Sequence, residues 1–416
     1  MANIDKKEVI INDKVLIATV DIGRKYNQGY WTAPNGEECK PFSFRNIRGG
    51  FDKFWAIIRK AMGKYKLSKV VIGFESTGPY GEPLQHFMKE KAGVELVQVN
   101  PMHTKRVKEL EGNSPQKSDE KDPRVIAMII KLGHYLSCIM PEGAAAELRS
   151  LSHAREFQME RLVGLSNRLD ALLFKVFPEF RETTKDPLGQ TGRYLLSNYT
   201  TPKEIVSLGL EELSRIMKQK SRGVFGASKA KKFFEGAIDS VGIKEGLSGL
   251  VMEIKLLLKE IEQCEEAIGQ IEMELEKWLK EIPYSEHLLS IKGISIVTVA
   301  GIIGEVGDFR IYSSQGAIIK MGGLNIYEIS SGKHRGERHI SKRGRPLMRK
   351  ILFFAALNVV KPGGIMHQEY KKKVDRGQKK IKALVAISRK LLSVMYAMVR
   401  DDMGHISNYS ELMKEA

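Results

Sequence analysis

Ten apolar residues between positions 250 and 282 follow one another at alternating steps of four and three residues. The stripe consists of Leu250, Ile254, Leu257, Ile261, Cys264, Ile268, Ile271, Leu275, Trp278 and Ile282. This spacing keeps one apolar seam on a single side of a helix, and such a seam must be buried against a partner helix. The chain is therefore predicted to contain a coiled coil.

A second seam lies earlier in the chain, in the stretch that follows residue 144. Its members are Leu162, Leu165, Leu169, Leu172 and Val176. The same register carried back toward the N-terminus meets polar Arg155 and Gln158, so this seam is interrupted. Two arrangements remain open, because register alone does not choose a partner: an antiparallel hairpin within one chain, or a pair formed with another subunit.

The N-terminal part of the chain, up to about position 135, alternates between strand-like and helix-like patterns. Strands are predicted at "VLIATVD" (15–21), "VVIGFE" (70–75) and "VELVQVN" (94–100), and helices near 51–63, 80–91 and 123–133. Strands joined by helical crossovers pair at least partly in parallel, and functional side chains of such folds gather at the carboxyl ends of the strands. We expect an α/β domain.

Changes of pattern divide the chain into three parts: an α/β domain at 1–143, a coiled-coil region at 144–284 and a mainly α-helical domain at 285–416. Residues 178–246 form a helical insert in the second part, where "TPKE" (201–204) has the form of a capping box and no chemistry is identified. The third part opens with two apolar helices around "KGIS" (292–295), as in a helix-hairpin-helix element, whose turn can approach a phosphate.

The composition favours a polyanionic partner. Sixty-seven Lys and Arg against fifty Asp and Glu leave a formal net charge of +17, which favours nucleic acid. Cys39, Cys138 and Cys264 are too few and too far apart for a disulfide framework or a zinc site. No secretory signal or membrane-spanning run is present, so we expect a cytoplasmic protein that does not bind a membrane.

Four carboxylates occupy positions where an α/β domain exposes functional side chains. Asp21 and Glu75 end two predicted strands, and "KSDEKDPRVIA" contains Asp119 and Asp122, three residues apart. Clustered carboxylates bind Mg²⁺ or Mn²⁺, because a cation relieves their mutual repulsion. Taken singly, each has a structural explanation: Asp21 and Glu75 can start turns, and Asp122 before Pro123 suits a helix N-cap. The set as a whole favours a metal site.

A serine-containing segment precedes the strongest positive charge of the chain. Ser330 and Ser331 stand directly before Gly332 in "ISSGKHRGERHISKRG". Residues 333–350 hold eight Lys or Arg against one Glu, and residues 371–382 hold seven against one Asp. Nearby cations can activate a serine for attack on a DNA phosphate. The alternative is an ordinary Ser-Ser-Gly turn.

These motifs together resemble the DEDD-type insertion-sequence transposases, which are bridge-RNA-guided serine recombinases. The matching segments are "VDIG", "FESTGPYG", "KSDEKDPRVIA", "IKGISIVTVAGIIGEVGDF", "KMGGLN" and "SSGKHRGERHISKRGRPLMRKIL". The resemblance implies a RuvC-like domain of the RNase H fold, joined through a coiled coil to a C-terminal transposase domain with a nucleophilic serine. Expected partners are donor DNA, target DNA and a noncoding bridge RNA, within a nucleoid-associated dimer or tetramer in which two protomers complete one active site.

Carried over residue by residue, the resemblance assigns the DEDD set to Asp21, Glu75, Asp119 and Asp122, as ligands of Mg²⁺ or Mn²⁺. It assigns the nucleophile to Ser331, whereas a slip of one residue in the alignment would select Ser330. The basic side chains around the turn and the serine are expected to contact nucleic acid. They are Lys292, Lys333, Arg335, Arg338, Lys342, Arg343, Arg345, Arg349 and Lys350.

Two other functions remain open. In the first, the α/β domain is a metal-dependent nuclease of the Holliday-junction type, and Ser331 only contacts a phosphate. In the second, the protein is a noncatalytic scaffold that binds nucleic acid, and the carboxylates are caps and turns. The first predicts that cleavage depends on Asp21 but not on Ser331, and the second predicts salt-sensitive binding without cleavage.

Overall fold

The computed structural model describes residues 11–75, 78–112, 122–331 and 334–404. The chain divides into two compact units. The N-terminal unit comprises residues 1–140 together with 310–317, and the C-terminal unit comprises residues 141–309 together with 318–416. The three-part division expected from the sequence stays a prediction.

A six-stranded mixed sheet forms the centre of the N-terminal unit, in the order β3-β2-β1-β4-β5-β6. The strands are β1 (Val15–Asp21), β2 (Tyr26–Thr32), β3 (Phe42–Arg45), β4 (Lys69–Glu75), β5 (Val94–Val99) and β6 (Leu136–Ser137). β1, β4 and β5 are parallel, while β2, β3 and β6 pair antiparallel to their neighbours. The structure confirms the expected α/β domain with a partly parallel sheet and adds three strands that the sequence patterns did not indicate.

Helices cover both faces of this sheet, which explains why its central strands are apolar throughout. Leu16 and Ala18 of β1 share a core with α1 (Arg48–Lys64) and α2 (Glu82–Lys89). Val15 and Ile17 pack with α4 (Asp122–Lys131) on the opposite face. The short turn η1 (Pro79–Gly81) precedes α2, and α3 (Pro101–Gly112) follows β5.

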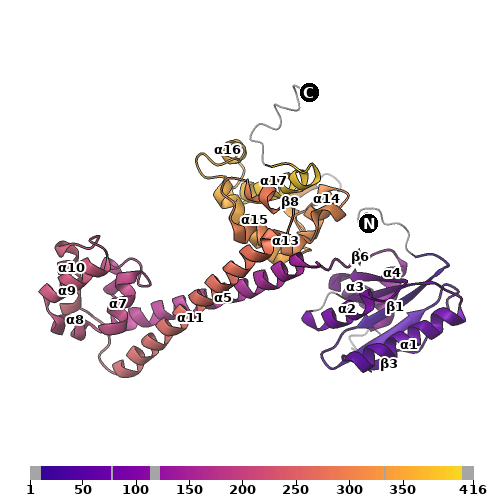
Figure 1. The fold of residues 1–416 in the computed structure, drawn as a ribbon, viewed down its shortest axis with the longest axis horizontal. Coiled ribbons are helices and arrows are strands. Elements are labelled where there is room, and N and C mark those ends of the chain that lie inside the picture. Colours follow the sequence, from indigo (N-terminus) through magenta and orange to yellow (C-terminus); the bar gives the residue numbers. More distant parts are fainter. Residues whose placement is uncertain (1–10, 76–77, 113–121, 332–333, 405–416) are drawn as a thin grey trace. The chain divides into compact units, whose positions relative to one another are not determined.

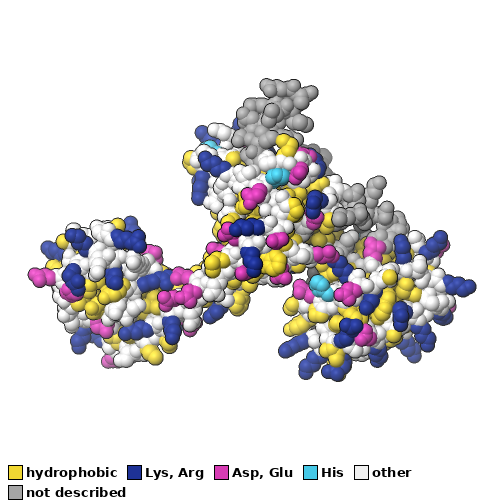
Figure 2. All heavy atoms as spheres, viewed as in Figure 1, with side chains coloured by type: hydrophobic (Ala, Val, Ile, Leu, Met, Phe, Trp, Pro, Cys, Tyr) yellow, Lys and Arg dark blue, Asp and Glu magenta, His cyan; other side chains and the backbone are white. Residues whose placement is uncertain are grey.

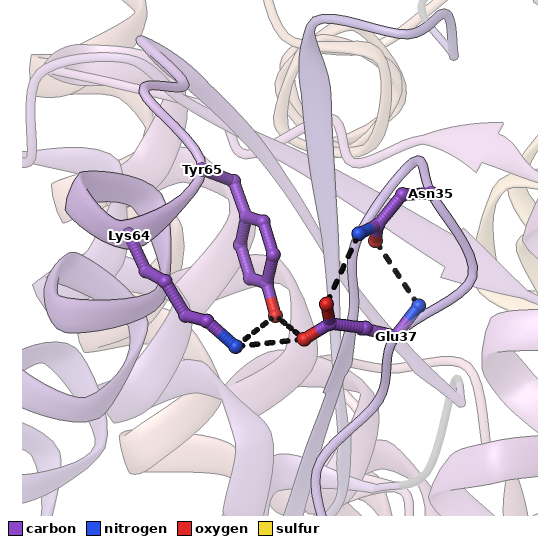
Figure 3. A network of polar contacts seen from close by, with 4 residues as sticks. All are labelled: Asn35, Glu37, Lys64 and Tyr65. Atoms are coloured by element: carbon purple, nitrogen blue, oxygen red, sulfur yellow. Dashed lines mark hydrogen bonds and ion pairs between the residues drawn. The ribbon is translucent and has the colours of Figure 1, made fainter.

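Four polar residues fasten the end of α1 to the turn after β2 (Figure 3). The Lys64 ammonium donates to Glu37 at 2.7 Å and to the Tyr65 hydroxyl at 2.8 Å, and Tyr65 also donates to Glu37. Asn35 donates to the same carboxylate at 3.3 Å. These hydrogen bonds, first those from Lys64, hold the pKa of Glu37 below its usual value. Since Thr32 of β2 pairs with Ile17 of β1, this network follows the end of β2 that lies away from Asp21.

Two long helices, α5 (Ala144–Val176) and α11 (Leu247–Lys280), pack along each other in the C-terminal unit (Figure 1). Three ion pairs show that they run antiparallel, because partner numbers fall along α11 as they rise along α5. The pairs are Arg155–Glu272, Arg161–Glu260 and Arg168–Glu253. The pairing left open by the sequence is thus an internal hairpin, and the break at Arg155 is an interhelical ion pair.

The apolar stripe on α11 is buried as predicted over most of its length. Ile254, Ile261 and Cys264 are fully covered. Near the end of the helix the buried position is Leu279, while its predicted neighbour Trp278 stays partly exposed. A helix of about 3.6 residues per turn drifts relative to a strict seven-residue repeat, which explains the shift by one residue.

The insert folds into five short helices at one end of the α5–α11 pair (Figure 1). They are α6 (Phe180–Thr183), α7 (Gln190–Asn198), α8 (Pro202–Leu208), α9 (Leu210–Lys220) and α10 (Ala227–Ile238). Phe180 and Phe233 meet in a core that continues into the ends of α5 and α11. The predicted capping box is present, since the Glu204 amide donates to Thr201 Oγ1 at 3.2 Å and the Thr201 amide to Glu204 Oε2 at 2.8 Å.

The remaining part is mainly helical, as expected, and contains one two-stranded sheet. Its elements are α12 (Ser285–Leu289), α13 (Ile296–Val306), η2 (Phe309–Ile311), α14 (Gln315–Met321), β7 (Ile326–Ser331), β8 (His334–Ile340), α15 (Pro346–Val359), α16 (His367–Asp375) and α17 (Lys380–Arg400). Gly293 has a φ of 93° and makes the turn between α12 and α13. Among the described residues, no helix has the length and apolar content that crossing a membrane requires.

Candidate functional site

Two of the predicted metal ligands end neighbouring parallel strands at the same level. Val20 of β1 pairs with Phe74 of β4, so the next residues along the two strands are Asp21 and Glu75. Side chains alternate between the faces of a strand. Since Val15 and Val71 pack on the α4 side of the sheet, both carboxylates belong to that same face.

A buried hydrogen bond brings the third carboxylate to this face. Thr19 Oγ1 donates to the carbonyl oxygen of Pro123 at 2.6 Å, which joins the first turn of α4 to β1 two residues before Asp21. Asp122 is the first residue of α4. We call Asp21, Glu75 and Asp122 the carboxylate corner. Asp119, the fourth predicted member, lies outside the described residues.

Two asparagines hold the backbone around the carboxylate corner. Asn27 is fully buried and accepts from the Gly23 amide at 3.0 Å, and it donates to Asn46 at 3.1 Å. Asn46 in turn donates to the carbonyl oxygens of Gly23 and Tyr80, at 3.1 and 3.0 Å. The loop after β1 is thereby tied to η1, which follows β4. Sequence reasoning missed both asparagines, because β2 and the 46–47 turn carry no periodic apolar pattern.

The donor chemistry of the carboxylate corner fits a divalent cation, since carboxylate oxygens are the ligands that Mg²⁺ prefers. Lys108 Nζ lies 2.5 Å from Asp122 Oδ1, so positive charge already balances one of these carboxylates. Within the described residues, no three His, Cys, Asp or Glu side chains are grouped closely enough to share one ion. A metal site here therefore needs Asp119 or a rearrangement of the Asp122–Lys108 ion pair.

The predicted nucleophile lies at the end of strand β7, a strand that the sequence patterns did not indicate. Ser331 pairs with His334 of β8, and Ser330 pairs with Arg335. The pairing is irregular between Glu328 and Ser330, which indicates a bulge just before the serines. Bulges redirect the residues that follow them and are common beside active sites.

Glycines close the base of this hairpin. The Lys342 amide donates to the Gly323 carbonyl at 2.9 Å, and the Arg345 amide donates to the Met321 carbonyl at 3.0 Å. A side chain on Gly344 would begin 2.2 Å from the Met321 carbonyl oxygen, closer than any real contact. This backbone approach explains why "MGG" and "RG" stand at the two ends of the hairpin.

Four of the residues predicted to contact nucleic acid also make contacts within the protein. Arg338 pairs with Glu328 at 2.7 Å, and Lys350 pairs with Glu156. Arg349 donates to the Gly322 carbonyl oxygen at 3.0 Å, and burial lowers its pKa. The fourth, Arg345, approaches a buried carboxylate described below.

Three other predicted contacts, Lys292, Lys342 and Arg343, are exposed and have no acidic partner among the described residues. Arg335 is placed by its backbone pairing with Ser330. Lys333 lies outside the described residues. Lys292 lies in the α12–α13 turn, and Lys342 and Arg343 lie at the base of the hairpin.

A buried ionic network connects the hairpin base to the long helices. Glu305 on α13 is only 2% exposed and lies 3.2 Å from Arg149, 2.8 Å from His153 and 3.7 Å from Arg345. Burial raises the pKa of Glu305, but the His153 hydrogen bond and the two arginines outweigh it and hold the pKa below its usual value. Sequence reasoning missed Glu305, although it is the single charged residue in the apolar run 294–306.

Glu305→Gln is expected to lower the free energy of unfolding by about 1.5 to 3 kcal/mol, because the partly buried Arg149 and Arg345 lose a charged acceptor. Urea unfolding measures the loss, and exposed Glu286→Gln is the control, expected to change stability by less than about 0.5 kcal/mol. Because the pKa of Glu305 is lower in the folded state than in the unfolded state, this residue stabilises the fold fully at pH values above its unfolded-state pKa. The stabilisation is lost as the pH falls through the folded-state pKa. The difference between wild type and variant should therefore shrink in acid; a constant difference would contradict this origin.

Two family models match the chain. Residues 18–178 match the model DEDD_Tnp_IS110, described as "Transposase", and residues 285–371 match the model described as "Transposase IS116/IS110/IS902 family". Together they cover more than half of the chain. The first match contains the carboxylate corner, and the second contains the β7–β8 hairpin.

Known proteins show the same likeness over 39% to 92% of the chain. The "Insertion element IS110 uncharacterized 43.6 kDa protein" of Streptomyces coelicolor is 22% identical over 92% of this chain and 93% of its own length. The "Insertion element IS116 uncharacterized 44.8 kDa protein" of Streptomyces clavuligerus is 24% identical over 68% and 71%. The "Transposase for insertion sequence element IS1111A" of Coxiella burnetii is 27% identical over 39% and 43%. The chain belongs to the IS110 family of DEDD-type insertion-sequence transposases.

Proposed function

We propose that this protein is the transposase of a mobile element and that it cuts and rejoins DNA by serine attack. The observation that carries the proposal is the β7–β8 hairpin, in which Ser331 ends a strand within the segment that matches the transposase family. Exposed Lys342 and Arg343 follow the same hairpin, where they can hold a phosphate backbone. The relatives named as transposases support DNA as the substrate.

For the N-terminal unit we propose the RNase H-like, RuvC-like fold. Its support is the strand order, in which an antiparallel β3-β2-β1 meander continues into parallel β4 and β5. In such open sheets ligands bind at the carboxyl ends of the parallel strands. Asp21 and Glu75 end β1 and β4, so the carboxylate corner is the proposed cation site of this unit.

The proposed reaction has two phosphoryl transfers. In the first, the Ser331 oxygen bonds to phosphorus, the bond from phosphorus to the 3′-oxygen of the preceding nucleotide breaks, and that oxygen takes up the proton lost by serine. In the second, the 3′-hydroxyl of the exchanged strand attacks the phosphoserine, which restores the serine hydroxyl and closes the new strand. One phosphodiester bond is lost and one is formed, so no external energy source is needed.

Asp21, Glu75, Asp119 and Asp122 would hold Mg²⁺ or Mn²⁺ when it is bound, and the cation would stabilise charge on the phosphate oxygens. Asn27 and Asn46 join the loop that follows Asp21 to η1, which follows β4, and Thr19 holds the start of α4. The serine hairpin belongs to a different unit. As the resemblance implies, we propose that two protomers of a dimer or tetramer together complete each active site.

We also propose a noncoding bridge RNA as the partner that selects the DNA sites. The family resemblance supports this partner, and the net charge of +17 supports polyanionic partners of either kind. In this proposal the protein contacts the backbone phosphates, and base pairing between the RNA and the DNA selects the DNA sequence.

The test is to trap the covalent intermediate. The protein is incubated with labelled duplex carrying an element end, in Mg²⁺ and with copurified RNA retained, then denatured and digested, and the nucleotide-bearing peptide is sequenced. We expect the label on Ser331. Cut DNA without an adduct would support instead a metal-dependent nuclease, which the carboxylate corner also favours, and binding with neither product would support a scaffold.

A further inference from the structure

The insert presents a basic corner that the proposed strand chemistry does not use. Residues 215–232, from α9 through the following loop into α10, contain seven Lys or Arg and no Asp or Glu. Three of the seven have acidic neighbours: Arg215 pairs with Glu212, Lys231 with Glu235 and Lys232 with Glu182. The other four have none among the described residues, and we call them the tip cations. They are Lys218, Lys220, Arg222 and Lys229.

The tip cations stand on a corner that is closed by hydrogen bonds. The Gly223 amide donates to the Lys218 carbonyl at 2.8 Å and closes the end of α9, and the Phe225 amide donates to Ser221 Oγ at 2.8 Å. Lys220 lies over the Tyr194 ring and Lys229 over the Phe225 ring, each with Nζ 4.2 Å from the ring centre. Stacking on a ring restricts a lysine side chain, so less entropy is lost when it binds a phosphate.

Helix stability explains only part of this charge. Lys218 and Lys220 stand in the last turn of α9, where positive charge stabilises a helix. Lys229 stands in the first turn of α10, where positive charge opposes the helix dipole, and that turn contains no acidic residue. Arg222 has a φ of 53°, which the end of α9 accounts for: it follows the C-cap Ser221, and its amide donates to the Gln219 carbonyl at 3.2 Å. A phosphate partner would account for the positive charge at Lys229.

The length of α5 and α11 determines how far the tip cations lie from the other end of the helix pair. α5 runs from Ala144 to Val176. At a rise of about 1.5 Å per residue, a helix of this length spans about 50 Å. Figure 1 shows the insert at one end of the α5–α11 pair and α13 and α15 at the other. The insert shares a continuous core with α5 and α11, so it is a fixed extension of the pair. Figure 2 shows Lys and Arg side chains over this lobe.

We infer that the tip cations form a second duplex-DNA contact, on phosphates about 15 base pairs from those held near the serine hairpin. The spacing follows from about 50 Å of helix and about 3.4 Å per base pair. The inference rests on the proposed function, since it takes the DNA bound by the C-terminal helices as its ligand. Duplex DNA is favoured over a flexible single strand because two contacts on one rigid arm need a ligand of matching stiffness.

The experiment compares wild type with a variant carrying Lys218→Gln, Lys220→Gln, Arg222→Gln and Lys229→Gln. A matched control carries Lys175→Gln, Lys185→Gln, Lys203→Gln and Lys244→Gln, which removes four exposed cations elsewhere in the same lobe. The full-length proteins are titrated with duplexes of roughly 12 and 40 base pairs at several salt concentrations. Circular dichroism confirms equal helix content.

On the long duplex, the slope of log affinity against log salt should be flatter for the tip variant by about 3 to 4, because four phosphate contacts are lost. The short duplex cannot reach both the serine hairpin and the tip cations, so the tip variant and wild type should have equal slopes on it. The control should match wild type on both duplexes. Equal slopes on the long duplex would overturn the inference. A change seen only with copurified RNA would overturn it in favour of an RNA contact. Adduct formation is scored separately, so failure of the serine chemistry leaves this comparison intact.

Discussion

Ser331→Ala is expected to abolish covalent protein–DNA adducts and to reduce recombination by roughly 10⁴-fold or more, because loss of a nucleophile removes the covalent path. Residual rates then come from binding and electrostatic stabilisation alone. Affinity for duplex DNA should stay within about twofold, because phosphate contacts come from Lys and Arg and not from the serine hydroxyl. Adducts are counted on denaturing gels, and recombination by sequencing of joined products.

The neighbouring serine provides the matched control. Ser330 pairs with Arg335, one position along the same strand. Ser330→Ala removes the same atoms from the same segment, so the two variants differ only in which hydroxyl is lost. Ser330→Ala should keep adduct formation close to that of wild type. If Ser330→Ala removes the adduct and Ser331→Ala keeps it, the nucleophile is Ser330; normal adducts in both variants would exclude the hairpin as the reaction centre.

Asp21→Asn is expected to slow DNA cleavage by roughly a hundredfold to a thousandfold, a typical effect of losing one electrostatic contact at a reacting phosphate. The amide keeps the shape of the side chain but not the negative charge that a divalent cation requires. The stabilisation of the fold by Mg²⁺ is a second readout, and it does not depend on activity. Mg²⁺ at a hundred times its Kd should stabilise the wild-type fold by about 2.7 kcal/mol, and Asp21→Asn should lose most of this gain.

Asp52→Asn is the control for this prediction, since Asp52 is an exposed residue of α1 that pairs with Arg48. It should cut DNA and respond to Mg²⁺ as wild type does. If cleavage and the stabilisation by Mg²⁺ are both unchanged in Asp21→Asn, the carboxylate corner does not hold the cation. If Asp21→Asn loses the stabilisation by Mg²⁺ but cuts DNA normally, the cation binds at the carboxylate corner but is not needed for cleavage.

The sequence predicted those strands and helices whose pattern is dictated by burial. β1 and β4 are covered on both faces, so their centres are runs of apolar residues that stand out in the chain, and β5 still holds four apolar residues in six. β2 mixes buried Tyr30 with polar Asn27 and Gln28, and β6 spans only Leu136–Ser137, so neither has a recognisable period. Strands β7 and β8 were missed for the same reason, because their charged residues look like a solvated loop.

In the candidate site, too, some residues follow from a sequence pattern and others do not. Asp21 and Glu75 could be placed at strand ends because the carboxyl ends of parallel strands meet at one edge of a sheet. Lys108, Asn27 and Asn46 could not be predicted, because each acts through a partner far along the chain or in an unpatterned segment. The three charged partners of Glu305 all lie far from it along the chain, and no spacing rule connects them.

By itself the sequence determined the α/β domain, the two long helices with their apolar seams, the carboxylates at the strand ends and the concentration of positive charge near the serines. These features follow from local periodicity and composition, which are written along the chain. Only the tertiary structure decided that the long helices pair within one chain, that the serines end a strand and that Arg345 contacts buried Glu305. Such features depend on which distant residues meet, and that is settled by the packing of whole elements and not by any local pattern.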